Sequence, residues 1–184
     1  SLLVSVFCFV VIFAVALMVG KYNMSISDFF KAVFTSEEAF DTQRSIIVNL
    51  RLPRTIVAGL TGIALSISGL LYQEVFQNKL TSPDLLGVSS GASVGAAIAL
   101  VLGLSSIFVS LFAFISGVVT VLITILVSRI FKNGSSFTLI LAAIIVGGFM
   151  SASLSLVKYF ADPTTTLANI TYWLMGSFEN STMN

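Results

Sequence analysis

The sequence predicts an all-α membrane protein: a polytopic bundle of about five transmembrane helices with short interfacial helices. Of its 184 residues, 57% are hydrophobic and only 9% are charged, whereas an average soluble domain has roughly 25% charged residues. Five apolar runs approach the length of about 20 residues that crosses a hydrocarbon layer as a helix. We therefore expect one membrane domain over residues 1–184 of a multi-pass protein of the cell (inner or plasma) membrane.

Polar or interfacial segments separate the expected spans. Ser25–Asp28 has the spacing of a capping box and begins a short amphipathic helix suited to a membrane surface. Pro53 predicts the start of the second span, and Asn133-Gly134 predicts a tight reversal before the fifth. The last apolar stretch, 167–178, is too short to cross and is expected at the interface. The five spans are expected at about 2–20, 55–73, 85–103, 107–131 and 137–160.

The composition excludes several function classes. A net charge of +1 offers no basic surface for nucleic acid. With no His and one Cys, the chain can assemble neither a zinc site nor a disulfide by itself. A phosphate-binding Gly-x-x-x-x-Gly-Lys-Ser/Thr loop is missing, so ATP and other cofactors are not expected on this chain. Without a pair of acid–base groups inside the bilayer, an enzyme is not expected either. The chain starts directly in apolar sequence and reads as part of a longer polypeptide.

Small residues indicate how the helices meet, because helices in lipid associate where small side chains let the backbones approach. Gly87, Gly91 and Gly95 recur at every fourth position of the third span. Ordinary packing inside the subunit explains this stripe better than a transport pathway or a dimer seam. In the fifth span, polar residues would be wasted against lipid, so packing and a wet passage both remain open. The pathway candidates there are Gly147, Ser151 and Ser155.

A resemblance adds to this interpretation. The segment 51–95 begins Arg-Leu-Pro-Arg, contains an Asn-x-Leu-x-x-Pro connector at 78–83, and continues through Leu-Gly-Val-Ser and Gly-Ala at 86–92. A Trp-x-x-Gly-Ser signature follows at 173–177. In this order, the motifs resemble the permeases of ABC importers for iron-siderophores, haem and cobalamin (FecCD-like). The chain resembles the N-terminal half of such a permease.

The resemblance implies a function and a set of partners. Family members have about ten spans per subunit and form the translocation pathway for an iron-siderophore, haem or cobalamin. Two permease subunits, alike or different, work with two cytoplasmic ATPase subunits and an extracytoplasmic substrate-binding protein. The resemblance places the N-terminus inside, although the positive-inside rule, counted on this chain alone, argues against that. The family's ATPase-coupling loop lies beyond the fifth span.

The resemblance also implies a docking role for Arg51 and Arg54. In the family these arginines face glutamates of the binding protein, and the planar guanidinium suits carboxylates. From the residues alone, anchoring of the helix end among lipid head groups is the better explanation. With the resemblance, docking is favoured.

Two inner gate elements are implied in the same way. Asn78 and Leu80 would meet their counterparts in the second permease subunit. Here the sequence departs from the usual Asn-Pro-Leu-Ala, because Lys79 replaces the stiffening Pro. Ser135 and Ser136 match a second gate element, although a plain polar turn explains them equally well.

A secondary transporter or channel that works without an ATPase is the alternative function. It would also show small-residue stripes and broken helices. Such a protein is expected to carry an ionisable coupling residue in mid-membrane. None of the charges here lies deep within an expected span, and Lys158 is close enough to an end to reach the interface.

Overall fold

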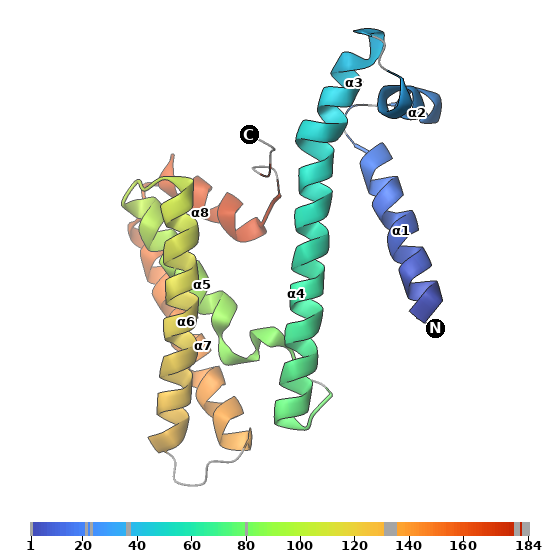
Figure 1. Ribbon diagram of the computed structural model, residues 1–184. Helices are drawn as coiled ribbons and strands as arrows, with labels where there is room; N and C mark the ends of the chain where they lie inside the picture. Colours follow the sequence, from blue (N-terminus) through green and yellow to red (C-terminus); the bar gives the residue numbers. More distant parts are fainter. Residues whose placement is uncertain are drawn as a thin grey trace. The chain divides into compact units, whose positions relative to one another are not determined.

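The computed structural model describes residues 2–20, 22, 24–35, 38–79, 81–130, 136–178 and 181. Within these ranges the regular structure is helical, which confirms the predicted all-α fold (Figure 1). The chain divides into two compact units, one of Ser1–Ala64 with Ser177–Asn184 and one of Leu65–Gly176. Helix α4, Leu52–Phe76, begins in the first unit and ends in the second.

The first unit contains two helices that precede α4. Helix α1 runs along the first turns of α4, and a Cβ on Gly59 would lie 3.8 Å from the Phe9 ring. Ser25 is the N-cap of α2, as its spacing predicts, but its side chain makes no capping hydrogen bond. The elements in order are α1 (Leu2–Met18), α2 (Ile26–Phe34), a 3₁₀ turn η1 (Glu38–Phe40), α3 (Asp41–Ser45) and a π-helical turn η2 (Ile46–Arg51).

Helix α4 begins at Leu52, so Pro53 lies in its first turn, where the sequence predicts a helix start. The helix is continuous over Asp41–Phe76, and Pro53 lies just after the π-helical turn. A proline inside an α-helix clashes with the carbonyl four residues earlier and lacks an N–H. In η2 the N–H of Leu52 instead reaches back to the carbonyl of Ile47, so the wider turn relieves the crowding before the proline.

The second unit is a bundle of α5, α6 and α7, with α8 packed against α5. One buried cluster joins α5 to α6 through Ala96, Ala99, Val109 and Ala113. A second brings Ala97 of α5 together with Ala161 and Ile170. The elements are a 3₁₀ turn η3 (Pro83–Leu86), α5 (Val88–Val101), α6 (Ser106–Ile130), α7 (Ser136–Phe160) and α8 (Thr166–Met175).

Three helical stretches among the described residues are long and apolar enough to cross a membrane: Asp41–Phe76, Ser106–Ile130 and Phe137–Phe160. Helix α5 has only 14 residues, about 21 Å at 1.5 Å per residue, and is shorter than the span expected at 85–103. Gly87 precedes it with φ +74°. Gly103 (φ +67°) ends it in a Schellman motif, in which the N–H of Leu104 bonds the carbonyl of Ala99.

Candidate functional site

Two glycines of α5 permit a very close approach to α6. A Cβ on Gly91 would lie 2.6 Å from the Cβ of Thr120, and a Cβ on Gly95 would lie 2.6 Å from the Cβ of Ser116. The added carbon on Gly95 would also overlap the backbone carbonyl of Phe112. Because a backbone carbonyl cannot move without its helix, α5 and α6 can keep this separation only with glycine at these positions.

Two buried threonine hydroxyls of α6 lie on the same side. Both side chains are 0% exposed. Thr120 donates to the carbonyl of Ser116 at 2.7 Å, and Thr124 donates to the carbonyl of Leu86 at 3.3 Å. Each buried hydroxyl therefore has a partner, and the second bond ties the end of turn η3 to α6.

The three predicted pathway residues lie in different surroundings. A Cβ on Gly87 would lie 3.3 Å from the Cα of Gly147, so Gly147 packs against the N-cap residue of α5. Ser151 and Ser155 are exposed, and the Ser155 hydroxyl donates to the carbonyl of Ser151 at 3.0 Å. The neighbouring Gly148 has open space where a Cβ would be. The exposed small face of α7 thus contains Gly148, Ser151 and Ser155, while Gly147 packs.

The predicted gate connector is folded by Thr81. Asn78 is exposed, whereas Thr81 is only 6% exposed. The Thr81 N–H and hydroxyl both donate to the Asn78 carbonyl, at 3.2 and 2.8 Å. Gln77 before the turn has φ +50°, a conformation uncommon for residues other than glycine. Leu80 and Ser135 lie outside the described residues, as does the side chain of Ser136.

Arg51, a predicted docking residue, is only 9% exposed and contacts the end of α1. Its guanidinium donates to the carbonyls of Leu17 at 3.0 Å, Met18 at 2.6 Å and Tyr22 at 2.6 Å. A Cβ on Gly20 would lie 2.9 Å from Arg51 Nη2, so glycine leaves room for the guanidinium. We call these contacts the α1 clamp. Arg54, the second predicted docking residue, is half-buried.

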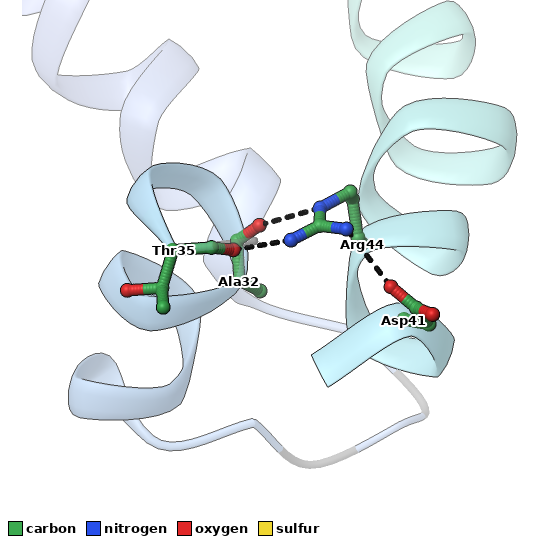
Figure 2. Close-up of polar contacts among 4 residues, drawn as sticks. All are labelled: Ala32, Thr35, Asp41 and Arg44. Atoms are coloured by element: carbon green, nitrogen blue, oxygen red, sulfur yellow. Dashed lines mark hydrogen bonds and ion pairs between the residues drawn. The ribbon is translucent and has the colours of Figure 1, made fainter. Parts of the chain in front are cut away.

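Arg44 forms a similar arrangement at the end of α2, the α2 clamp (Figure 2). Its guanidinium donates to the carbonyl of Ala32 at 3.1 Å and to that of Thr35. An ion pair with Asp41 at 2.8 Å holds the same side chain from its own helix. Neither clamp was predicted. Cations near the end of their own helix are a known sequence signal, but these arginines cap a different helix and leave no local pattern.

Asp162 lies between α7 and α8 and is fully exposed. Its carboxylate accepts the N–H and hydroxyl of Thr164 at 2.9 and 2.6 Å, and those of Thr165 at 3.0 and 3.1 Å. These bonds, the Thr164 hydroxyl first, lower the pKa of Asp162 below its ordinary value. Among the described residues, no group of three or more His, Cys, Asp or Glu side chains is placed to hold a metal ion.

The known proteins to which the chain is similar include several permease proteins of import or transport systems. The chain is 33% identical over 170 residues to the molybdate import system permease protein MolB of Haemophilus influenzae, covering 91% of this chain and 50% of that protein. It is 31% identical over 174 residues to the hemin transport system permease protein HmuU of Yersinia pestis, covering 92% and 52%. It is 37% identical over 130 residues to the vitamin B12 import system permease protein BtuC of Salmonella choleraesuis, covering 70% and 40%.

The fold has a solved counterpart. A metal-chelate type ABC transporter in an inward-facing conformation matches with a TM-score of 0.80 and 31% sequence identity, covering 99% of this chain and 55% of that one. The chain spans about half the length of the curated relatives that it matches. The apolar helices and these permease relatives make the chain a multi-pass membrane protein. Since the sequence profile of the FecCD transport family also matches residues 8–184, the chain belongs to that family.

Proposed function

We propose that this chain forms part of the translocation pathway of a binding-protein-dependent ABC importer. A second permease subunit completes the pathway, two cytoplasmic ATPase subunits drive it, and an extracytoplasmic binding protein delivers the cargo. The observation that carries the proposal is the likeness, over nearly the whole chain, to a solved ABC transporter at 31% identity. A likeness of that extent covers the helix order, the connector and the short α8 together.

The cargo is proposed as an iron-siderophore, with haem and cobalamin as further members of the class. Relatives named for iron chelatin, hemin and vitamin B12 support this assignment. The relative named for molybdate import supports a small oxyanion as a further candidate. A parallel comparison of these cargoes therefore belongs in the first experiment.

The route of the cargo is proposed to follow the exposed small face of α7. Ser151 and Ser155 are exposed there, and Gly148 leaves open space beside them. Serine hydroxyls that bond backward along their own helix keep a passage polar without a fixed charge that would trap the cargo. The Asn78 connector is proposed as an inner gate, because its exposed Asn78 stands on a turn that Thr81 holds rigid.

Docking of the binding protein is proposed at the α1 end of α4, around Arg54 and Arg51. Charged pairs across such a surface set register and association rate. This part of the proposal is supported by the Arg-Leu-Pro-Arg segment at 51–54.

The test is uptake in a strain that lacks the gene for this protein. The strain, with and without a plasmid copy, is given radiolabelled ferric siderophore, haem, cobalamin or molybdate in parallel. Restored uptake that vanishes when the partner ATPase carries an inactive phosphate loop supports the importer. Uptake that survives ATPase inactivation but collapses with a protonophore would instead identify a secondary transporter.

A further inference from the structure

Two arginines of one continuous helix hold the ends of two other helices. The last carbonyls of a helix have no partner within it and carry partial negative charge. Arg51 donates to such carbonyls at the end of α1, and Arg44 donates to those at the end of α2. We propose that Arg51 and Arg44 are positioning residues, each of which fixes one helix end against the start of the long helix Asp41–Phe76.

The α1 clamp depends on the shape of the guanidinium. Its fork reaches two carbonyls that lie four positions apart in the sequence, those of Met18 and Tyr22, each at 2.6 Å. A lysine ammonium is a compact point charge and cannot span both carbonyls in the same way. Gly20 lies between the two carbonyls in sequence, and its missing side chain gives the guanidinium its place. Arg51 and Gly20 therefore work as a pair.

The α2 clamp has an additional support. The Asp41 carboxylate, three residues before Arg44 on the same helix, pairs with its Nη1 at 2.8 Å. This pair keeps the guanidinium turned toward Ala32 and Thr35 (Figure 2). The Arg44 side chain is 36% exposed, so water competes with this clamp more than with the buried α1 clamp.

The role of the α1 clamp in docking rests on the proposed function. Arg51 has three of its donor contacts committed to the α1 end. It therefore shapes the surface beside Arg54 by holding the α1 end in place, and its own charge is not what a partner binds. Loss of the clamp would weaken docking even where both arginines are retained.

The test places a nitroxide label on each helix end in turn. Cys8, the one cysteine of the chain, is first replaced by serine. V19C then reports on the end of α1 and F34C on the end of α2, since both side chains are exposed, at 70% and 80%. Each label is combined with R51A, R44A or G20A in the protein in nanodiscs, with R129A on α6 as the matched loss of an exposed arginine.

Each substitution is expected to affect only the label on the helix end that it contacts. R51A and G20A should remove most of the immobilised component of the V19C spectrum and leave F34C unchanged, whereas R44A should do the reverse. R129A should change neither label. The proposal is overturned if R51A and G20A both leave the V19C label immobile, or if R51A and R44A each mobilise both labels, as general unfolding would. If R51A fails to fold, G20A still tests the α1 clamp, because it retains Arg51.

Binding-protein affinity, measured on the same samples, separates this inference from the proposed function. G20A should weaken binding although Arg51 and Arg54 are both present. If G20A mobilises V19C and binding stays at the wild-type level, the clamp exists but does not shape the docking surface. If the wild-type protein binds no such partner, the proposed function fails while the label results still decide the clamp.

Discussion

The two units of the molecule join their helices by different means. In the unit Leu65–Gly176, α5 and α6 touch through glycines, and two threonine hydroxyls are buried beside them. In the unit that contains α1 and α2, the helix ends are held by arginine side chains that donate to backbone carbonyls. Part of this chain therefore relies on shape and part on a few directed bonds.

The difference follows from the position along the helix. Midway along a helix the backbone groups are already paired, so contact between helices depends on how closely the surfaces fit. At a helix end the carbonyls are unpaired, so a cation gains from both hydrogen bonding and the helix dipole. Substitutions should accordingly be most damaging where backbone meets backbone, and milder where a side chain supplies the contact.

The largest effect is expected for G95A. The new Cβ would overlap the Phe112 carbonyl and lie 2.6 Å from the Cβ of Ser116, so α5 and α6 must separate. Overpacking of this kind typically costs about 3 kcal/mol at the upper end. G91A should cost less, because part of its clash is with the Thr120 side chain. Thermal unfolding of the purified protein in detergent measures both.

G148A is the matched control for this prediction. Gly148 also lies within a long helix, but a Cβ there meets nothing within 4 Å. Alanine is favoured over glycine in a helix by roughly 1 kcal/mol, so G148A should be neutral or slightly stabilising. Equal melting temperatures for G95A and G148A would show that the close approach of α5 and α6 does not limit stability.

An intermediate effect is expected for R51A. Hydrogen bonds from a charged group contribute about 2 kcal/mol, and the three carbonyls near Arg51 would lose theirs. R44A should cost about 1 kcal/mol, because its site is partly exposed and screened. Thermal unfolding is again the measurement, with R129A as the control. A larger loss in R44A than in R51A would break the proposed dependence on burial.

Sequence reasoning succeeded where a signal repeats along the chain. The apolar runs predicted the membrane fold, which the long apolar helices and the family confirm. It failed where a signal depends on the path of the backbone. Nothing in the sequence marks the π-helical turn that precedes Pro53 and continues the helix back toward α3. Helix α5 covers less than the stretch expected at 85–103, because the apolar Leu85 and Leu86 lie in a 3₁₀ turn before it.

The candidate site shows the same limit. Arg51 was identified by its motif, but its contact with α1 joins residues 33 and 34 positions apart in the sequence. Such a bond is set by tertiary structure and has no local pattern. The same holds for Gly20, because the space that it leaves for the Arg51 guanidinium is visible only in the fold.

A smaller effect is expected in the connector. The resemblance noted in the sequence implies Asn-Pro-Leu-Ala here, and this chain has Lys79 and Thr81 in place of Pro and Ala. The Thr81 hydroxyl, bonded to the Asn78 carbonyl at 2.8 Å, supplies rigidity that proline would supply through its fixed φ. T81A should reduce the hydrogen-exchange protection of the backbone amide at position 81 by about fivefold, the equivalent of roughly 1 kcal/mol.

K79P tests whether the two features are interchangeable. Added to T81A, it should restore much of the lost protection, because proline suits the second position of this turn. Hydrogen exchange measured by mass spectrometry on the connector gives the comparison. If T81A alone leaves the exchange unchanged, the hydroxyl does not stiffen the turn.

The smallest effect is expected at Asp162 and depends on pH. Because its folded-state pKa is lowered, its stabilisation is complete above the pKa of the unfolded chain and is lost as the pH falls through the folded-state value. Hydrogen exchange in α8, compared at matched chemical exchange rates, should therefore rise on acidification. D162N should show faster exchange at neutral pH and little further change in acid. Equal acid responses in both proteins would remove Asp162 as the cause.

The π-helical turn Ile46–Arg51 has a consequence for how the two arginines are aimed. Seven residues separate Arg44 from Arg51, and in a regular α-helix that spacing returns to within about 20° of the same direction. Both side chains would then compete for one neighbour. In the wider π-helical turn, of which Arg51 is the last residue, each residue turns the chain by less than in an α-helix, so Arg51 points in a different direction from Arg44 and can contact a different helix end. A single-residue deletion within 46–50 would thus redirect Arg51 without altering its chemistry.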